Sequence, residues 1–262
     1  MPAALDEVIG AIEDIAPLSL AYEWDNSGLL LRCGDKVSRV LIALDVTKEI
    51  ALKAEQLGCD MILAHHPLMF EAKKRFDCRK TSDAVMMSLI RSGISLYAAH
   101  TSFDKAGGGT NDELAQKLGL ENIEVITGSG EGLVRVGCFK IPLSKNELAE
   151  HVEHALGIDT LKISLSDIDM IEKAAVVGGS GGDFIEAAKK AGAHALITGE
   201  AKHHHFLEAQ AQGVLLIEAG HFNTERCFVE KAFMSLQLRL DELQLNVDLF
   251  KADNVQSPYK YI

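Results

Sequence analysis

Residues 39–66, RVLIALDVTKEIALKAEQLGCDMILAHH, contain the clearest pattern of secondary structure in the chain. It reads as an apolar strand, a polar turn, an amphipathic helix, a glycine and a second apolar strand, which is typical of a βαβ unit with parallel strands. Residues 173–200, KAAVVGGSGGDFIEAAKKAGAHALITGE, repeat the pattern without a gap. The sequence therefore predicts two related βαβ halves, with the general likeness of all βαβ units as the alternative explanation.

The strands that follow these halves end in matching polar pairs. GISLYAAHTSFD, ending at Asp104, resembles GVLLIEAGHFNTE, ending at Glu225. In each, a histidine precedes the acid by four residues: His100 before Asp104, and His221 before Glu225. Ligands of open α/β sheets bind at the carboxyl ends of the strands, so these residues lie where a crevice is expected. Coincidence is the alternative.

Apolar runs alternate with amphipathic stretches along the whole chain, which predicts an α/β protein with largely parallel strands. The glycine-rich stretch from Thr127 to Gly137 predicts a boundary between two lobes. We expect a first α/β lobe of residues 1–127 plus 225–262 and a second of residues 128–224. The candidate strands are residues 28–32, 39–45, 61–64, 94–99, 134–139, 174–179, 195–198, 214–219 and 245–250.

The composition is that of a soluble globular protein. The 262 residues are 47% hydrophobic and 24% charged, with a formal net charge of −12. This acidic balance argues against a broad nucleic-acid surface, which is normally basic. Five scattered cysteines without a CxxC pair fit reduced thiols. The sequence has no run of about 18 apolar residues, so it predicts no membrane span. Residues 1–17 are predicted to form an amphipathic helix and not a signal peptide. We therefore expect a cytoplasmic protein.

Two adjacent histidines, His65 and His66, follow the predicted strand that ends at Ala64 and precede Pro67. The proline keeps His66 out of the helical region, and neighbouring residues of a strand point to opposite faces, so the two imidazoles diverge. Diverging ligands suit two ions about 3.5 to 4 Å apart, as in two-metal hydrolytic sites. The alternative is a core histidine beside a surface histidine.

His221 and Glu225 lie at neighbouring positions on the first turn of a predicted helix. Gly220 allows the chain to bend sharply after the preceding strand, which favours a site over the alternative of a surface pair. Histidine and carboxylate together favour Zn, Mn, Fe or Ni over Ca or Mg. The absence of a nearby cysteine argues against a structural zinc.

Six sequence blocks span nearly the whole chain and are specific together. They are WDNSGLL (24–30), ALDVT (43–47), AHHP (64–67), AHTSFDKAGGGTND (99–112), TGEAKHH (198–204) and AGHFNTER (219–226). In this order, the blocks resemble the NIF-three-like family, also catalogued as GTP cyclohydrolase I type 2 homologues. In two places where other members often carry Gly-Asp and Tyr-His, this chain has Gly199-Glu200 and His203-His204.

The resemblance implies a fold, an assembly and a metal site. The implied fold is two interlinked α/β domains, here in the short form, since the chain length leaves no room for the middle domain that some members carry. The implied assembly is a toroidal homohexamer with metal sites facing an internal cavity. The implied centre holds two divalent ions per chain, with Glu225 bridging them. Its ligands are His65, His66, Asp104, His221 and Glu225.

Further polar residues lie near the predicted ligands. His100 is a candidate general acid or base, or a structural histidine. The run His203–His205 opens a predicted helix, and we predict that His204 faces the site. Lys105 and Arg226 adjoin predicted ligands and would meet an anionic substrate.

Two loops have a functional and a structural explanation. Residues 24–26, Trp-Asp-Asn, either shape the floor of a pocket or form a turn. GGSGGD at 178–183 opens a helix after a strand but lacks the full dinucleotide-binding fingerprint, so it is weak support for nucleotide binding.

These observations predict a metal-dependent hydrolase in which His100 and Glu225 are catalytic. Two ions would bind a water and lower its pKa toward ~7. The family label implies attack on the purine imidazole carbon of GTP with release of formate, although the residues do not show guanine recognition. Another nucleotide or a small anionic substrate fits the same ligands. The alternative is a non-catalytic metal-binding scaffold or regulatory interaction protein.

Overall fold

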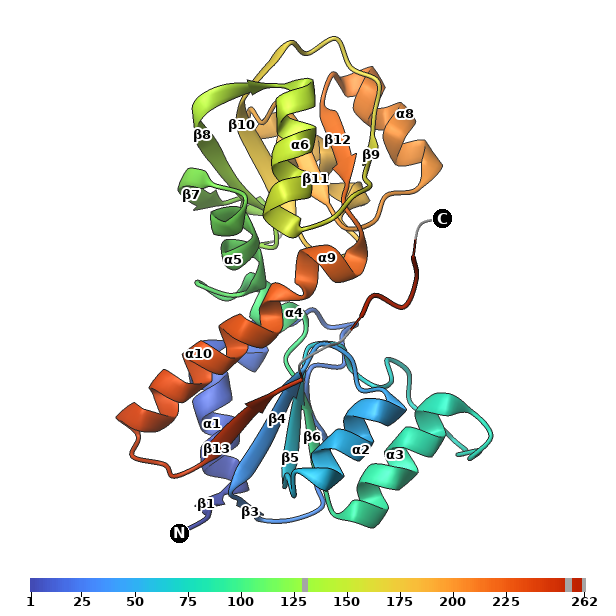
Figure 1. The fold of residues 1–262 in the computed structure, drawn as a ribbon, viewed down its shortest axis with the longest axis vertical. Helices are drawn as coiled ribbons and strands as arrows, with labels where there is room; N and C mark the ends of the chain where they lie inside the picture. The colour runs from blue at the N-terminus through green and yellow to red at the C-terminus, as the bar shows by residue number, and fades with distance from the viewer. Residues whose placement is uncertain (129–131, 253–255, 261–262) are drawn as a thin grey trace. The chain divides into compact units, whose positions relative to one another are not determined.

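The computed structural model describes residues 1–128, 132–252 and 256–260, which form two compact units. Unit 1 comprises Met1–Gly109 and Phe228–Val255, and unit 2 comprises Thr110–Cys227 and Gln256–Ile262. Unit 1 is built on a mainly parallel sheet and unit 2 on a mixed sheet, each with helices on both faces (Figure 1). The predicted α/β class is confirmed.

Unit 1 is built on a five-stranded sheet of order β13-β4-β5-β6-β2. The first four strands of this order are parallel, and β2 runs antiparallel to β6. A short antiparallel pair, β1 with β3, lies outside this sheet. The strands are β1 (Ala3–Ala4), β2 (Gly28–Leu31), β3 (Lys36–Val37), β4 (Arg39–Ala43), β5 (Met61–Ala64), β6 (Ser95–Ala98) and β13 (Asp248–Lys251).

Helices cover both faces of the unit 1 sheet. Helices α2 and α3 lie on one face, and α1 and α10 lie on the other (Figure 1). Leu41 and Ile62 pack in the core under α2 and α3, whereas Tyr97 donates a hydrogen bond of 3.1 Å to Glu13 of α1. The helices are α1 (Leu5–Ile15), η1 (Leu18–Leu20), α2 (Lys48–Gln56), α3 (Thr81–Ser92), α4 (Thr101–Lys105) and α10 (Cys227–Glu242).

Unit 2 is built on a six-stranded sheet of order β7-β8-β10-β11-β12-β9. Strands β10, β11 and β12 are parallel, and the other three strands pair antiparallel to their neighbours. The strands are β7 (Leu120–Val125), β8 (Arg135–Ser144), β9 (Lys162–Ile163), β10 (Met170–Val177), β11 (Ala195–Thr198) and β12 (Leu215–Glu218).

Alternate residues of β10 face two separate cores in unit 2, as the two-residue period of a strand requires. Ala174 and Val176 pack with α5 and α6, whereas Ala175 and Val177 pack with α7 and α8. The helices are α5 (Thr110–Lys117), α6 (Lys145–Leu156), η3 (Gly182–Phe184), α7 (Ile185–Lys190), α8 (His203–Gln212) and α9 (His221–Glu225).

The two predicted halves share one strand register. In unit 1, Val40 pairs with Met61, and Met61 pairs with Ser95. In unit 2, Ala174 pairs with Ala195, and Ala195 pairs with Leu215. These residues occupy equivalent places in the aligned stretches, so the internal repeat predicted from the sequence is confirmed. The carboxyl ends of β4, β5 and β6, and of β10, β11 and β12, therefore present equivalent residues.

The unit boundary differs from the expected one near residue 127. Residues 110–127 belong with unit 2, because β7 pairs with β8 and α5 packs on the same sheet. Fully buried Arg135 of β8 also binds Asp112 of α5 through two nitrogens, at 2.7 and 3.1 Å. Strand β7 was not predicted from the sequence, because it lies at the edge of the sheet and most of its side chains are exposed. Residues 129–131 of the glycine-rich stretch lie outside the described part of the chain.

Among the described residues, no helix has the length and apolar character needed to cross a membrane. The five cysteines, all within that part of the chain, form no disulfide.

We expect Asp112→Ala to lower the free energy of unfolding by about 3 kcal/mol, because it leaves the buried Arg135 guanidinium without its carboxylate. Chemical denaturation would measure the loss. Glu124→Ala, which removes an exposed carboxylate from β7, is the control and should stay within about 0.5 kcal/mol of the parent. Equal stability of the two variants would contradict the role given to the buried pair.

Candidate metal centre

His65 is held rigidly at the carboxyl end of β5. Its side chain is fully buried, and its backbone N–H donates to Ala43 O at 3.1 Å. The ring Nδ1 lies 3.0 Å from Ala99 O. A carbonyl oxygen only accepts hydrogen bonds, so in the neutral imidazole Nδ1 carries the proton and Nε2 presents its lone pair. This is the tautomer that a metal ion requires at Nε2.

The lone pair of His65 faces a buried carboxylate. Nε2 of His65 lies 3.6 Å from Oδ1 of Asp104, on the one-turn helix α4. When the ring is neutral, both atoms are hydrogen-bond acceptors, and a cation between them would turn their repulsion into attraction. Two ligands of one tetrahedral ion with bonds of 2.0 to 2.2 Å lie about 3.4 Å apart. The observed separation therefore fits a shared ion.

Two further histidines of unit 1 are oriented in the same way. Nδ1 of His66 lies 2.8 Å from Asp45 Oδ1, and Nδ1 of His100 lies 2.8 Å from Asp25 Oδ1. Each carboxylate fixes the proton on Nδ1 and directs Nε2 away from itself. Ring nitrogens of His65, His66 and His100 all lie within 4.8 Å of one another.

Asp25 connects His100 to the start of α4. Burial opposes the charged form of this carboxyl, but hydrogen bonds from His100 and Thr101 outweigh that effect and lower its pKa well below the ordinary value. Its Oδ2 accepts from Thr101 N at 3.1 Å, from Thr101 Oγ1 at 2.6 Å and from Ser27 Oγ at 2.7 Å. The carboxylate thus positions both His100 and the helix that carries Asp104.

In unit 2, His221 and Glu225 lie together on α9, as their spacing predicts. Nε2 of His221 is 2.9 Å from Glu225 Oε2, and its Nδ1 is 3.3 Å from Glu200 Oε2. Burial disfavours the charged form of Glu200, yet hydrogen bonds from Ser180 and His221 lower its pKa. Gly220 precedes the helix with φ +89°, which confirms the bend inferred at this residue.

Glycines pack closely against helix α9, which carries Glu225. A Cβ atom on Gly179, which has φ +60°, would lie 2.2 Å from Glu225 Oε1. A Cβ on Gly199 would lie 2.6 Å from Thr224 Oγ1 and 2.8 Å from His221 Cα. The first two glycines of the GGSGGD loop, Gly178 and Gly179, therefore pack against a carboxylate, whereas Gly181 packs against Thr198 and Gly182 against His205. Close packing accounts for these glycines without a nucleotide phosphate.

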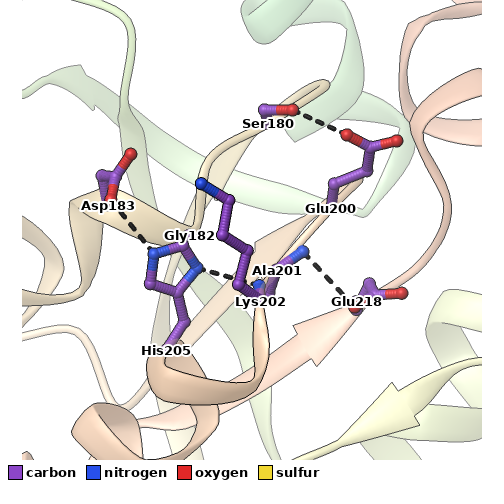
Figure 2. Close-up of a pocket in the computed structure, with 8 residues that line it drawn as sticks. All are labelled: Ser180, Gly182, Asp183, Glu200, Ala201, Lys202, His205 and Glu218. Carbon is purple, nitrogen blue, oxygen red and sulfur yellow. Dashed lines mark hydrogen bonds and ion pairs between the residues drawn. The ribbon is translucent and has the colours of Figure 1, made fainter.

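Glu200 also lines a pocket of about 410 Å³ in unit 2 (Figure 2). His205 is buried in its wall, with Nδ1 accepting from the backbone N–H of Lys202 at 3.0 Å and Nε2 donating to Asp183 at 3.0 Å (Figure 2). It is His205 that lines the pocket, whereas His204, predicted to face the site, is exposed.

The two predicted anion-binding cations make other contacts. The Lys105 ammonium lies 3.5 Å from the centroid of the Tyr22 ring. Arg226 donates a hydrogen bond to the carbonyl of Leu156.

Asp25, Asp45 and Glu200 were not recognised from the sequence as partners of the histidines. They lie in the blocks WDNSG, ALDVT and TGE, which carry the family resemblance and could have indicated that these carboxylates belong to the site.

Each unit is thus an α/β sheet whose carboxyl edge carries histidine and carboxylate side chains of the kinds that could hold a metal ion. Residues 3–258 match the family model Duf34/NIF3 (NGG1p interacting factor 3), and the chain belongs to this family. A GTP cyclohydrolase 1 type 2 homolog of Clostridium perfringens is 32% identical over 98% of this chain and 99% of its own. NGG1-interacting factor 3 of Saccharomyces cerevisiae is 30% identical over 89% of this chain and 90% of its own.

The likeness extends to solved structures. The crystal structure of a Bacillus cereus protein related to NIF3 superposes with a TM-score of 0.93 at 24% identity, covering all of both chains. This match establishes the fold, and the family membership rests on the sequence matches.

We expect Gly179→Ala to displace Glu225, because the added methyl group would overlap Oε1 of that side chain. Gly192→Ala is the matched control, since Gly192 also has positive φ but a Cβ added there would have nothing within 4 Å. Both variants should lose about 1 kcal/mol of stability from backbone strain. Only Gly179→Ala should lose more and shift the imidazole NMR signals of His221. Unchanged His221 signals would contradict the packing described.

Proposed function

We propose that this protein is a metal-dependent hydrolase that holds two divalent ions per chain, drawn from Zn, Mn, Fe and Ni. The proposed ligands are His65, His66, Asp104, His221 and Glu225, the last as the bridging ligand. The observation that carries the proposal is the 3.6 Å approach of His65 Nε2 to Asp104 Oδ1, two acceptor atoms in a buried place. A mixed histidine and carboxylate donor set suits these ions.

The residues around the proposed ligands fit this role. Metal-ligating histidines commonly donate the other ring N–H to a carboxylate or a backbone carbonyl, and His65 and His66 do so here to Ala99 O and Asp45. Two divalent ions, when bound, act as Lewis acids and lower the pKa of water toward ~7. The protein itself contributes fixed ligand directions, burial, and a wall of glycines that holds Glu225.

His100 is the proposed general acid or base. Its Nδ1 is fixed by Asp25, so Nε2 is the atom that would accept or deliver a proton. A carboxylate orients the imidazole in the same way in other acid–base pairs. The His100 side chain is 13% exposed, so the imidazole is partly open to solvent.

The reaction proposed is GTP cyclohydrolase-like hydrolysis of a nucleotide or a related small anionic molecule. Support comes from the names of relatives such as the C. perfringens protein, a GTP cyclohydrolase 1 type 2 homolog. A cytoplasmic homohexamer is part of the same proposal, following the family resemblance. Light scattering of the purified protein would test the assembly.

The second candidate function is a non-catalytic metal-binding scaffold or regulatory partner. The yeast relative is named for an interaction with NGG1, which favours this alternative. The two candidates differ in whether an ion keeps a coordination position for water, because a closed ligand shell supports storage or structure and an open one supports catalysis.

Elemental analysis of protein purified without chelator should find about two transition-metal ions per chain. His65→Ala should lower this number, because it removes a buried ligand that is already in the metal-binding tautomer. His154→Ala, which removes an exposed histidine of α6, is the control and should keep the full content. A chain that binds no Zn, Mn, Fe or Ni after incubation would refute the metal centre.

Catalysis is tested by formate release from GTP in metal-loaded protein. Glu225→Gln should lower metal content and abolish hydrolysis with the fold intact by circular dichroism. His100→Gln should keep two ions and lose about a hundredfold in rate, the range expected for a missing general acid or base. Loss of metal in His100→Gln would instead make His100 a ligand. Full metal content without turnover of any nucleotide tested would favour the scaffold.

A further inference from the structure

Two exposed aromatic side chains flank the histidines of unit 1. Trp24 is 63% exposed and Phe70 is 51% exposed. Both contact His100: the Phe70 ring centroid lies 5.6 Å from that of the imidazole, edge to face, and the Trp24 centroid lies 6.4 Å away, also edge to face. Large aromatic surface beside a polar cluster is characteristic of a binding site.

The position of Trp24 is fixed before any ligand binds. Its indole stacks on Tyr22 at a centroid distance of 5.5 Å and an interplanar angle of 17°. The Lys105 ammonium lies over the Tyr22 ring, and the backbone N–H of Tyr22 donates to Thr101 Oγ1 at 3.2 Å. A ring supported in this way loses little conformational entropy when a ligand covers it.

The loops that carry the two aromatic residues are also tied together. Asn26 Nδ2 donates to Met69 O at 2.7 Å, which joins the loop of Trp24 to the loop of Phe70. Between Trp24 and Asn26 lies Asp25, whose carboxylate holds His100. Aromatic surface and the proposed acid–base group are therefore parts of one hydrogen-bonded assembly.

We propose that Trp24 and Phe70 form a stacking platform for a planar aromatic heterocycle of the substrate. This inference rests on the proposed function, because the platform adjoins the histidines assigned to it. An aromatic ring is the occupant that uses the open face of an indole best, since aromatic pairs favour offset stacking and bases stack on such side chains with little dependence on sequence. A simple phosphate ester or an aliphatic acid would leave the platform unused.

The chain contains one tryptophan, so its fluorescence reports on Trp24 alone. Guanosine and adenosine carry planar rings without a phosphate that could bind a metal ion. We expect at least one of them to quench the indole emission saturably when it is excited at the red edge of its absorption. Ribose 5-phosphate, which has no aromatic ring, should not. Absence of saturable quenching by both nucleosides would overturn the proposal.

Variants test the platform by calorimetry of the nucleoside that quenches. Trp24→Leu and Phe70→Leu should each weaken its binding about tenfold, and Trp24→Phe should restore most of the affinity because it keeps an aromatic face. Phe76→Leu is the matched control, since Phe76 is 54% exposed in the same region and should bind as the parent does. Binding by Trp24→Leu equal to that of the parent would overturn the proposal.

The test of the platform can fail or succeed independently of the test of the metal centre. Metal content should be the same in Trp24→Leu and the parent. Saturable quenching in a chain that binds no metal would support the platform and refute the metal centre. A metal-loaded chain without quenching would support the metal centre and overturn the platform. An emission change that follows protein concentration without nucleoside would identify a second copy of the chain as the occupant and overturn the proposal.

Discussion

The hydrogen bond from His65 Nδ1 to Ala99 O, at 3.0 Å, is the interaction on which the account of the site depends. It joins the residues that follow two neighbouring parallel strands, β5 and β6, so the sheet itself sets the ring orientation. It also fixes the tautomer, and through the tautomer it turns the Nε2 lone pair toward Asp104. If the ring were reversed, the buried face toward Asp104 would carry an N–H donor, and the pair would be an ordinary hydrogen bond without a place for a cation.

The two units share the same arrangement of three parallel strands but carry different residues at equivalent positions. His65 and Gly199 each follow the middle strand, and His66 and Glu200 come next. In unit 1 the first of these positions supplies a buried imidazole. In unit 2 the same position has no side chain, and a Cβ there would collide with α9, so the glycine is what lets α9 approach the sheet. The repeated arrangement of strands thus places a buried histidine at this position in unit 1 and a close approach of α9 to the sheet in unit 2.

Much of this arrangement could be predicted from the sequence, for physical reasons. Buried parallel strands are short apolar runs, so β5 and β11 were located to the residue, and polar residues directly after such runs drew attention to His65, His66, His100 and His221. The orienting carboxylates were not predicted, because Asp45 and Asp25 lie 21 and 75 residues from the histidines that they hold. Only the tertiary fold brings them together. The boundary at residue 110 was missed for the same reason, since the buried pair of Asp112 with Arg135 leaves no periodic signal.

The shared ion between His65 and Asp104 is best tested by an anomalous difference map from crystals of the protein loaded with Mn or Zn. We expect two anomalous peaks per chain, about 3.5 to 4 Å apart, with one of them in contact with both His65 Nε2 and Asp104 Oδ1. A map without a peak at His65 and Asp104, from crystals that contain the metal, would contradict the claim that these two lone-pair atoms share an ion.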